Sequence, residues 1–187
     1  MTDKPQSSDQ AGNKPENKPE TKADDQAAGQ QATGPRMEMR KIYIKDVSFE
    51  SPASPDIFAR QDAQPKLDMQ ITINHKRIDP NGPFYEVVLN TTVTAKDKER
   101  TIFLAEVQQA GIFEIDGMQG EQLSMVLEIA CPNALLPFAR EAVSDLVGKG
   151  GFPQLLLNPV NFEMLYMQKK QQQAAKAGTA PDPSKVN

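Results

Sequence analysis

The stretch that decides the fold is residues 84–113, FYEVVLNTTVTAKDKERTIFLAEVQQAGIF. Its first part has apolar side chains with a period of two, which is typical of a strand with one buried face. These side chains are Tyr85, Val87, Leu89 and Val93. The polar link AKDKE is as short as a hairpin, and a second alternating run follows over 100–113. Strands joined so closely pair in antiparallel fashion, because a parallel pair needs a long crossover.

Two further alternating runs lie upstream, over 41–50 and 67–75. Downstream, helical spacing predicts a helix over 120–130 that Pro132 ends, and a second helix from Asn133 or Leu136. Glycines end that second helix, and the apolar loop FPQLLLNPV leads to a last helix from about Asn161. The prediction is an α+β fold, in which a four-stranded antiparallel sheet precedes helices packed on one face.

Composition separates the predicted domain from two tails. Residues 1–36 contain no Val, Ile, Leu or aromatic residue, so they cannot bury enough apolar surface to offset their conformational entropy. We therefore predict a disordered N-terminal tail over 1–36 and a polar, mostly disordered C-terminal tail over 168–187. One domain is expected over 37–167.

Charge and the scarcity of reactive residues exclude several functions. The predicted domain has 18 Asp and Glu against 12 Lys and Arg, which does not suit nucleic-acid binding. Cys131 is the only cysteine and His75 the only histidine, too few for a four-ligand zinc site. No nucleotide-binding or serine-hydrolase motif occurs. We expect no enzymatic activity, no cofactor and no metal, with Cys131 buried as a small hydrophobe and His75 solvated in a turn.

Neither a signal peptide nor an apolar stretch of about 20 residues is evident, so we expect a cytoplasmic protein with no direct membrane insertion.

Alternation assigns the side chains of the first and fourth strands to two faces. One face is predicted to hold Tyr43, Val47 and Phe49, together with Phe103, Ala105, Val107 and Gln109. The other is predicted to hold Ile42, Ile44, Asp46, Ser48 and Glu50, together with Ile102, Leu104, Glu106 and Gln108. If the more apolar face is buried, carboxylates and aliphatic side chains project outward. They form either a docking surface for a cationic partner or charges that protect a sheet edge.

Apolar residues also occur in two segments expected to be loops. Ile57 and Phe58 lie in the first, and Phe152, Leu155, Leu156 and Leu157 lie in the second. Such residues either fill the core or line a groove for extended apolar peptides.

Several blocks of this sequence resemble the SecB family. They are IYIKDVSFE (42–50), YEVVLNTTVTA (85–95), FLAEVQQAGIF (103–113), CPN (131–133), FPQLLLNPVNF (152–162) and the Gln-rich end that follows. The resemblance covers nearly all of 40–173, in order and with compatible spacing.

The resemblance implies a SecB-like fold and a homotetramer built as a dimer of dimers, with no cofactor. It also implies that unfolded precursor proteins bind in grooves and pass to the SecA motor. The SecA-contacting surface of the family corresponds to Asp46, Glu50, Leu104 and Glu106. Assembly positions correspond to Ala105, where the family often has Cys, and to Val107 and Gln109. The client groove would include Ile57, Phe58, Phe152, Leu155 and Leu157.

Two alternatives remain open on the sequence alone. One is a SecB-like chaperone dedicated to a single partner such as an antitoxin, or an adaptor without general holdase activity. The other is a small-molecule enzyme on the same α+β scaffold, which the absence of a nucleophile–base pair disfavours.

Overall fold

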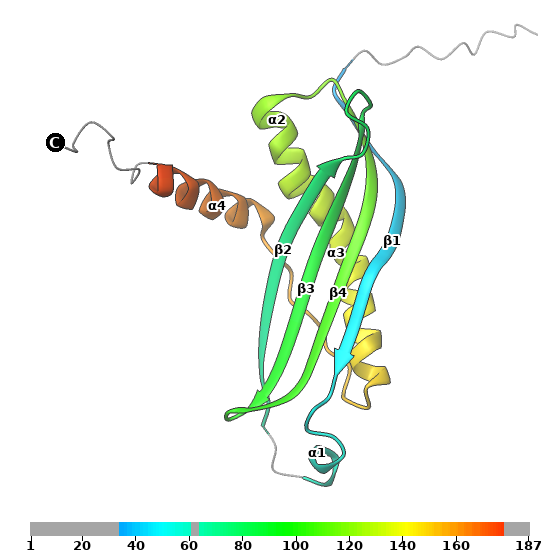
Figure 1. Ribbon diagram of the computed structural model, residues 1–187, viewed down its shortest axis with the longest axis vertical. Coiled ribbons are helices and arrows are strands. Elements are labelled where there is room, and N and C mark those ends of the chain that lie inside the picture. Colours follow the sequence, from blue (N-terminus) through cyan, green and yellow to red (C-terminus); the bar gives the residue numbers. More distant parts are fainter. Residues whose placement is uncertain (1–33, 61–63, 178–187) are drawn as a thin grey trace, which may run out of the picture. The chain divides into compact units, whose positions relative to one another are not determined.

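The computed structural model describes residues 34–60 and 64–177, so most of the two predicted tails, 1–33 and 178–187, lies outside the described residues. Four strands form one antiparallel sheet in the order β1-β4-β3-β2 (Figure 1). Their bounds are Arg36–Glu50 (β1), Lys66–Arg77 (β2), Phe84–Asp97 (β3) and Arg100–Asp116 (β4). The predicted antiparallel sheet is therefore confirmed.

A long helix covers one face of this sheet, which we call the inner face (Figure 1). Val143 and Val147 of the helix are buried with Ala105 and Val107 of β4. Nearer the other end, Leu135 is buried with Phe113. A fully buried aliphatic side chain contributes about 1.5–3 kcal/mol, so these contacts fix the helix against β3 and β4. The opposite side of the sheet is called the outer face.

The long helix is continuous, and the predicted break at Pro132 is wrong. It consists of Gly120–Met125 (α2), the π-helical turn Val126–Ala130 (η1) and Cys131–Lys149 (α3). The N–H of Cys131 bonds to the carbonyl of Val126, five residues back. This wider turn directly precedes Pro132 and gives room where a proline ring would otherwise contact the preceding turn. Pro137 is likewise inside α3.

The length of this helix also changes one expectation. By length and composition alone, Gly120–Lys149 would be able to cross a membrane. On the sequence alone, no apolar stretch of this length is expected, because a helix end is predicted at Pro132. Many of its apolar side chains instead pack against the inner face of the sheet.

The first strand, β1, differs from the predicted pattern in its middle. Its pairing with β4 shifts by one residue at Arg40 and again at Lys45. Each extra residue reverses which side chains face each side of a sheet. Tyr43 consequently lies on the outer face, and Ile42 and Ile44 lie on the inner face, so their predicted faces are wrong.

The remaining helices are α1 (Asp56–Ala59), in the loop after β1, and α4 (Phe162–Ala177). The side chain of Asn161 accepts a hydrogen bond from the N–H of Met164 at 2.9 Å, so α4 begins where the sequence predicts. It extends to Ala177, however. Residues 168–177 are therefore helical, and the predicted domain boundary at 167 falls inside α4.

Candidate functional site

The outer face of β1 and β4 carries the four residues predicted to contact SecA. Glu50 pairs with Leu104 and Asp46 pairs with Gln108, while Glu106 pairs with Ser48 between them. All three pairs point to the outer face. We call Asp46, Glu50, Leu104 and Glu106 the acidic patch. The structure brings them together, and Ile44, predicted to lie among them, is on the inner face.

Neighbouring hydroxyl groups orient the central carboxylate of the acidic patch. Ser48 Oγ donates to Glu106 Oε2 at 3.3 Å, and Thr92 Oγ1 donates to Glu106 Oε1 at 3.4 Å. Within the described part of the chain, no lysine or arginine forms an ion pair with Asp46, Glu50 or Glu106. The patch therefore presents three carboxylates beside an aliphatic side chain, an arrangement that favours a cationic partner with some apolar surface.

A second site lies on the opposite side, between the loop that holds α1 and the loop after α3. It is an open apolar cavity of about 490 Å³, which we call the apolar groove. The predicted residues Ile57, Phe58, Phe152 and Leu155 line it. Further lining residues that sequence reasoning missed are Leu67, Ile102, Phe103 and Val147.

Aromatic rings in mutual contact form the floor of the apolar groove. The ring of Phe152 lies 4.9 Å from Phe103 and 5.1 Å from Phe58, and the rings of Phe49 and Phe103 are 5.8 Å apart. Phe58 is 54% exposed, so part of this aromatic surface is open to solvent. Alternation had placed Phe49 and Phe103 on one face, but only the tertiary fold brings the loop residues to them.

Other predicted site residues lie elsewhere. Leu157 is buried in the core with Val143 and so is not part of the groove surface. Ala105 and Val107 are buried under α3, and Gln109 is buried with its side chain bonded to the backbone of β1. None of these three is available for direct contact with another copy of the chain, because α3 covers their face of the sheet.

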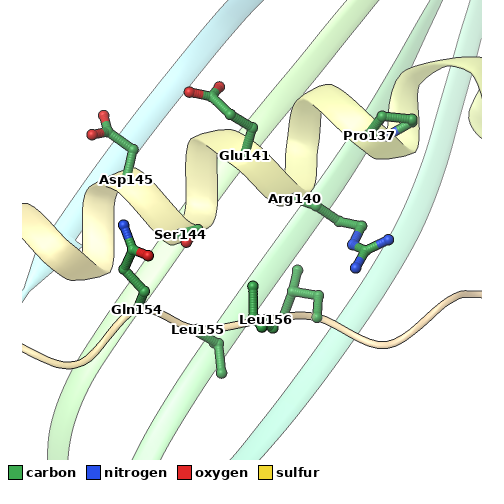
Figure 2. Close-up of a pocket in the computed structure, with 9 residues that line it drawn as sticks. Pro137, Arg140, Glu141, Ser144, Asp145, Gln154, Leu155 and Leu156 are labelled. Carbon is green, nitrogen blue, oxygen red and sulfur yellow. The ribbon is translucent and has the colours of Figure 1, made fainter.

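A second cleft, of about 410 Å³, separates α3 from the loop that follows it. Figure 2 shows Gln154 pointing from the loop toward α3, while Glu141 and Asp145 extend from the other side of the helix. Leu156 at its rim is 81% exposed, and Phe138 of α3 is 43% exposed. The cleft thus has apolar margins, although polar side chains line much of it.

The two residues with reactive side chains have structural surroundings. His75 is exposed, as predicted, but it lies in β2 and not in a turn, and its Nε2 lies 3.2 Å from Glu128 Oε1 on η1. Lys169 of α4 binds the same carboxylate, so Glu128 joins β2, η1 and α4. Cys131 is fully buried as predicted, and burial raises the pKa of its thiol to about 12. Among residues 34–60 and 64–177, no group of three or more potential ligands is placed to hold a metal.

Comparison with known proteins gives consistent matches. The family model for SecB, the preprotein translocase subunit, matches residues 30–173. The protein-export protein SecB of Chromobacterium violaceum is 51% identical over 151 residues, covering 81% of this chain and 98% of that protein. The corresponding protein of Nitrosococcus oceani is 52% identical over 153 residues, covering 81% and 90%.

A solved structure shares the fold. The SecB-like chaperone of Mycobacterium tuberculosis, in complex with an antitoxin peptide, aligns with a TM-score of 0.58 at 19% identity, covering 67% of this chain and 91% of that chain. The family model and the two export proteins each match most of the chain. The chain therefore belongs to the SecB family.

Proposed function

We propose that this chain is an ATP-independent holdase that binds unfolded precursor proteins in the cytoplasm and delivers them to the SecA motor for export. Membership in the SecB family makes the chain a protein-export chaperone and not an enzyme. The observation that carries the finer proposal is the separation of two surfaces on one sheet. The apolar groove lies on the inner side and the acidic patch on the outer face.

The apolar groove suits segments of many different sequences. Its aromatic floor offers contact area without a polar group that would select one side chain. Each such contact is weak, because an unfolded segment loses conformational entropy when it binds. Several grooves in one assembly raise the overall affinity through effective concentration. Tight binding then needs no nucleotide, and clients are withdrawn from folding by mass action.

The acidic patch suits the delivery of a bound client to SecA. Exposed carboxylates steer a cationic partner and fix its orientation, and Leu104 adds apolar contact area. Because the patch and the groove share no residue, SecA and a client would bind at the same time.

We also propose assembly into a tetramer, a dimer of dimers. Two exposed apolar side chains, Phe138 of α3 and Leu156 of the loop after it, support an interface on the outward side of α3. We expect an indirect influence on assembly from Ala105, Val107 and Gln109, which would act only through the position of α3 on the sheet.

A pair of reciprocal variants tests the division between the two surfaces. Asp46→Lys should weaken binding of a SecA C-terminal tail peptide by about tenfold or more and leave client affinity unchanged. Phe58→Ser should weaken binding of a reduced, unfolded precursor and leave the SecA peptide unaffected. Asp68→Lys is the matched control, because Asp68 is an exposed carboxylate on the outer face of β2.

Equal loss of both activities in Asp46→Lys would refute separate surfaces. If the wild-type protein binds the SecA peptide but leaves refolding of unrelated precursors unchanged, a chaperone or adaptor dedicated to one partner explains the data better.

A further inference from the structure

The acidic patch and the aromatic floor both depend on a single extra residue in β1. Ile44 pairs with Gln109 and Asp46 pairs with Gln108, so Lys45 is the additional residue of a β-bulge. After the bulge, Asp46 and Glu50 lie on the outer face, while Phe49 points inward to Phe103. Without it, regular alternation from Tyr43 would exchange these faces. Phe49 would then leave its stack on Phe103, and Asp46 would leave the acidic patch.

A buried carboxylate on β3 holds the bulge from the outer face. Lys45 Nζ donates to both carboxylate oxygens of Glu86, at 2.9 Å and 2.8 Å, and Tyr43 OH donates to Oε1. Glu86 is only 7% exposed. The hydrogen bonds from Lys45 and Tyr43 lower its pKa to about 2, so the carboxylate is ionised under ordinary conditions. Tyr43 and Lys45 flank Ile44, so this contact spans the start of the register shift.

A buried amide on β4 holds the same segment from the inner face. Gln109 Nε2 donates to the backbone carbonyl of Tyr43 at 2.9 Å, and Gln109 is 3% exposed. A buried amide gains its hydrogen bond only when that carbonyl is in position, because an unpaired buried polar group is costly. Tyr43 is therefore fixed by its side chain on one face and by its backbone from the other.

The other shift in β1 has a similar arrangement. Its extra residue, Arg40, donates through Nε to Glu114 Oε2 at 2.6 Å, and Arg36 also binds this carboxylate. Glu114 is buried, like Glu86. Each extra residue of β1 is thus a cation paired with a buried glutamate on another strand of the same sheet. The Arg40 bulge lies away from both binding surfaces and so provides an internal control.

We propose that Glu86 and Gln109 are positioning residues, which hold the Lys45 bulge and thereby decide which side chains of β1 reach the acidic patch and the apolar groove. This inference rests on the proposed function for what the two surfaces bind. Glu86 and Gln109 would then shape the acidic patch and the apolar groove without contacting SecA or a client.

The first test compares Glu86→Gln with the matched control Glu114→Gln. Loss of the charged hydrogen bonds should weaken both the SecA tail peptide and an unfolded precursor by about tenfold in Glu86→Gln. Glu114→Gln should leave both affinities within about twofold. Tyr43→Phe keeps the Lys45–Glu86 pair and should give a smaller loss of both affinities. It replaces Glu86→Gln in the test if that variant folds poorly.

The decisive measurement is the register of β1 by NMR, from cross-strand contacts of Asp46 with Gln108 and of Val47 with Val107. These contacts should weaken in Glu86→Gln and persist in Glu114→Gln. In the double variant, Lys45→Met should add little to the loss of affinity caused by Glu86→Gln, because Lys45 and Glu86 act as one hydrogen-bonded pair.

Loss of SecA binding alone with the wild-type register would show that Glu86 acts as a local contact, and the inference would be wrong. Unchanged affinities and register would also overturn it. If the wild type binds neither partner, the proposed function fails, and the register in Glu86→Gln still decides the inference.

Discussion

Glu86 illustrates how a single buried carboxylate links stability to pH. Its pKa falls from 4.5 to about 2 because of hydrogen bonds, first from Lys45 and then from Tyr43. The same contact raises the pKa of Tyr43 to about 12. A carboxylate with a lower pKa in the folded state stabilises the fold at pH values above its unfolded pKa. It loses that contribution as the pH falls toward the folded pKa.

At the residue scale we therefore predict a pH-dependent difference between the wild type and Glu86→Gln. The wild type should have the larger free energy of unfolding at neutral pH, and the difference should shrink as the pH falls from about 4.5 toward 2. Urea unfolding at several pH values, at one protein concentration, measures this. A difference that does not change with pH would mean that the ionised Glu86 contributes nothing to folding.

At the scale of elements, a glycine directly after α3 determines how closely the helix end approaches β1. A Cβ on Gly150 would lie 2.2 Å from Phe49 Cζ, whereas a Cβ on Gly148 would meet only Gln154 Cγ, at 3.8 Å. The first distance is far too short for a real contact, and the second is ordinary van der Waals contact. Gly150 therefore allows the Phe49 ring to stack on Phe103.

Alanine substitutions at the two glycines should have opposite effects. Gly150→Ala should destabilise the protein by about 1–3 kcal/mol, because it displaces the Phe49 ring, and it should also weaken client binding. Gly148→Ala should be neutral or stabilising by up to about 1 kcal/mol, because alanine favours the helix. Urea unfolding of both variants checks this; equal effects would mean that the ring moves aside freely.

The four strands and the start of the last helix could be predicted from the sequence, but α1 and two further local features could not. The period of two located all four strands, yet the shifts at Arg40 and Lys45 reversed the faces of Ile42, Tyr43 and Ile44. A bulge adds one residue without changing composition, so alternation alone cannot locate it. Because proline lacks an N–H, the sequence predicts a helix end at Pro132, whereas the π-turn before it lets the helix continue.

At the scale of the whole molecule, the acidic patch and the apolar groove lie on opposite sides of one sheet. Alternation correctly places Asp46 and Glu50 on the same face as Leu104 and Glu106, because Asp46 and Glu50 both follow the last register shift of β1. It did not show that α3 covers Ala105 and Val107, since a strand pattern does not reveal what lies on its buried face. The groove was predicted only in part, because its loop residues meet Phe49 and Phe103 through tertiary packing.

Assembly should depend on the outward side of α3. Phe138→Glu places a charge in the proposed interface, so sedimentation should show the wild type as a tetramer and this variant as a smaller species. Phe58→Ser is the control, because it changes an equally exposed phenylalanine outside that surface and should leave the mass unchanged. An unchanged mass for Phe138→Glu would exclude this side of α3 from the interface.

The most direct test of the holdase function is the refolding of a reduced, unfolded export precursor with and without this protein, in the absence of nucleotide. Stoichiometric amounts should arrest refolding, and a SecA tail peptide should bind the loaded complex. Refolding at the same rate with and without the protein, while the SecA peptide still binds, would contradict the assignment of the apolar groove to unfolded clients.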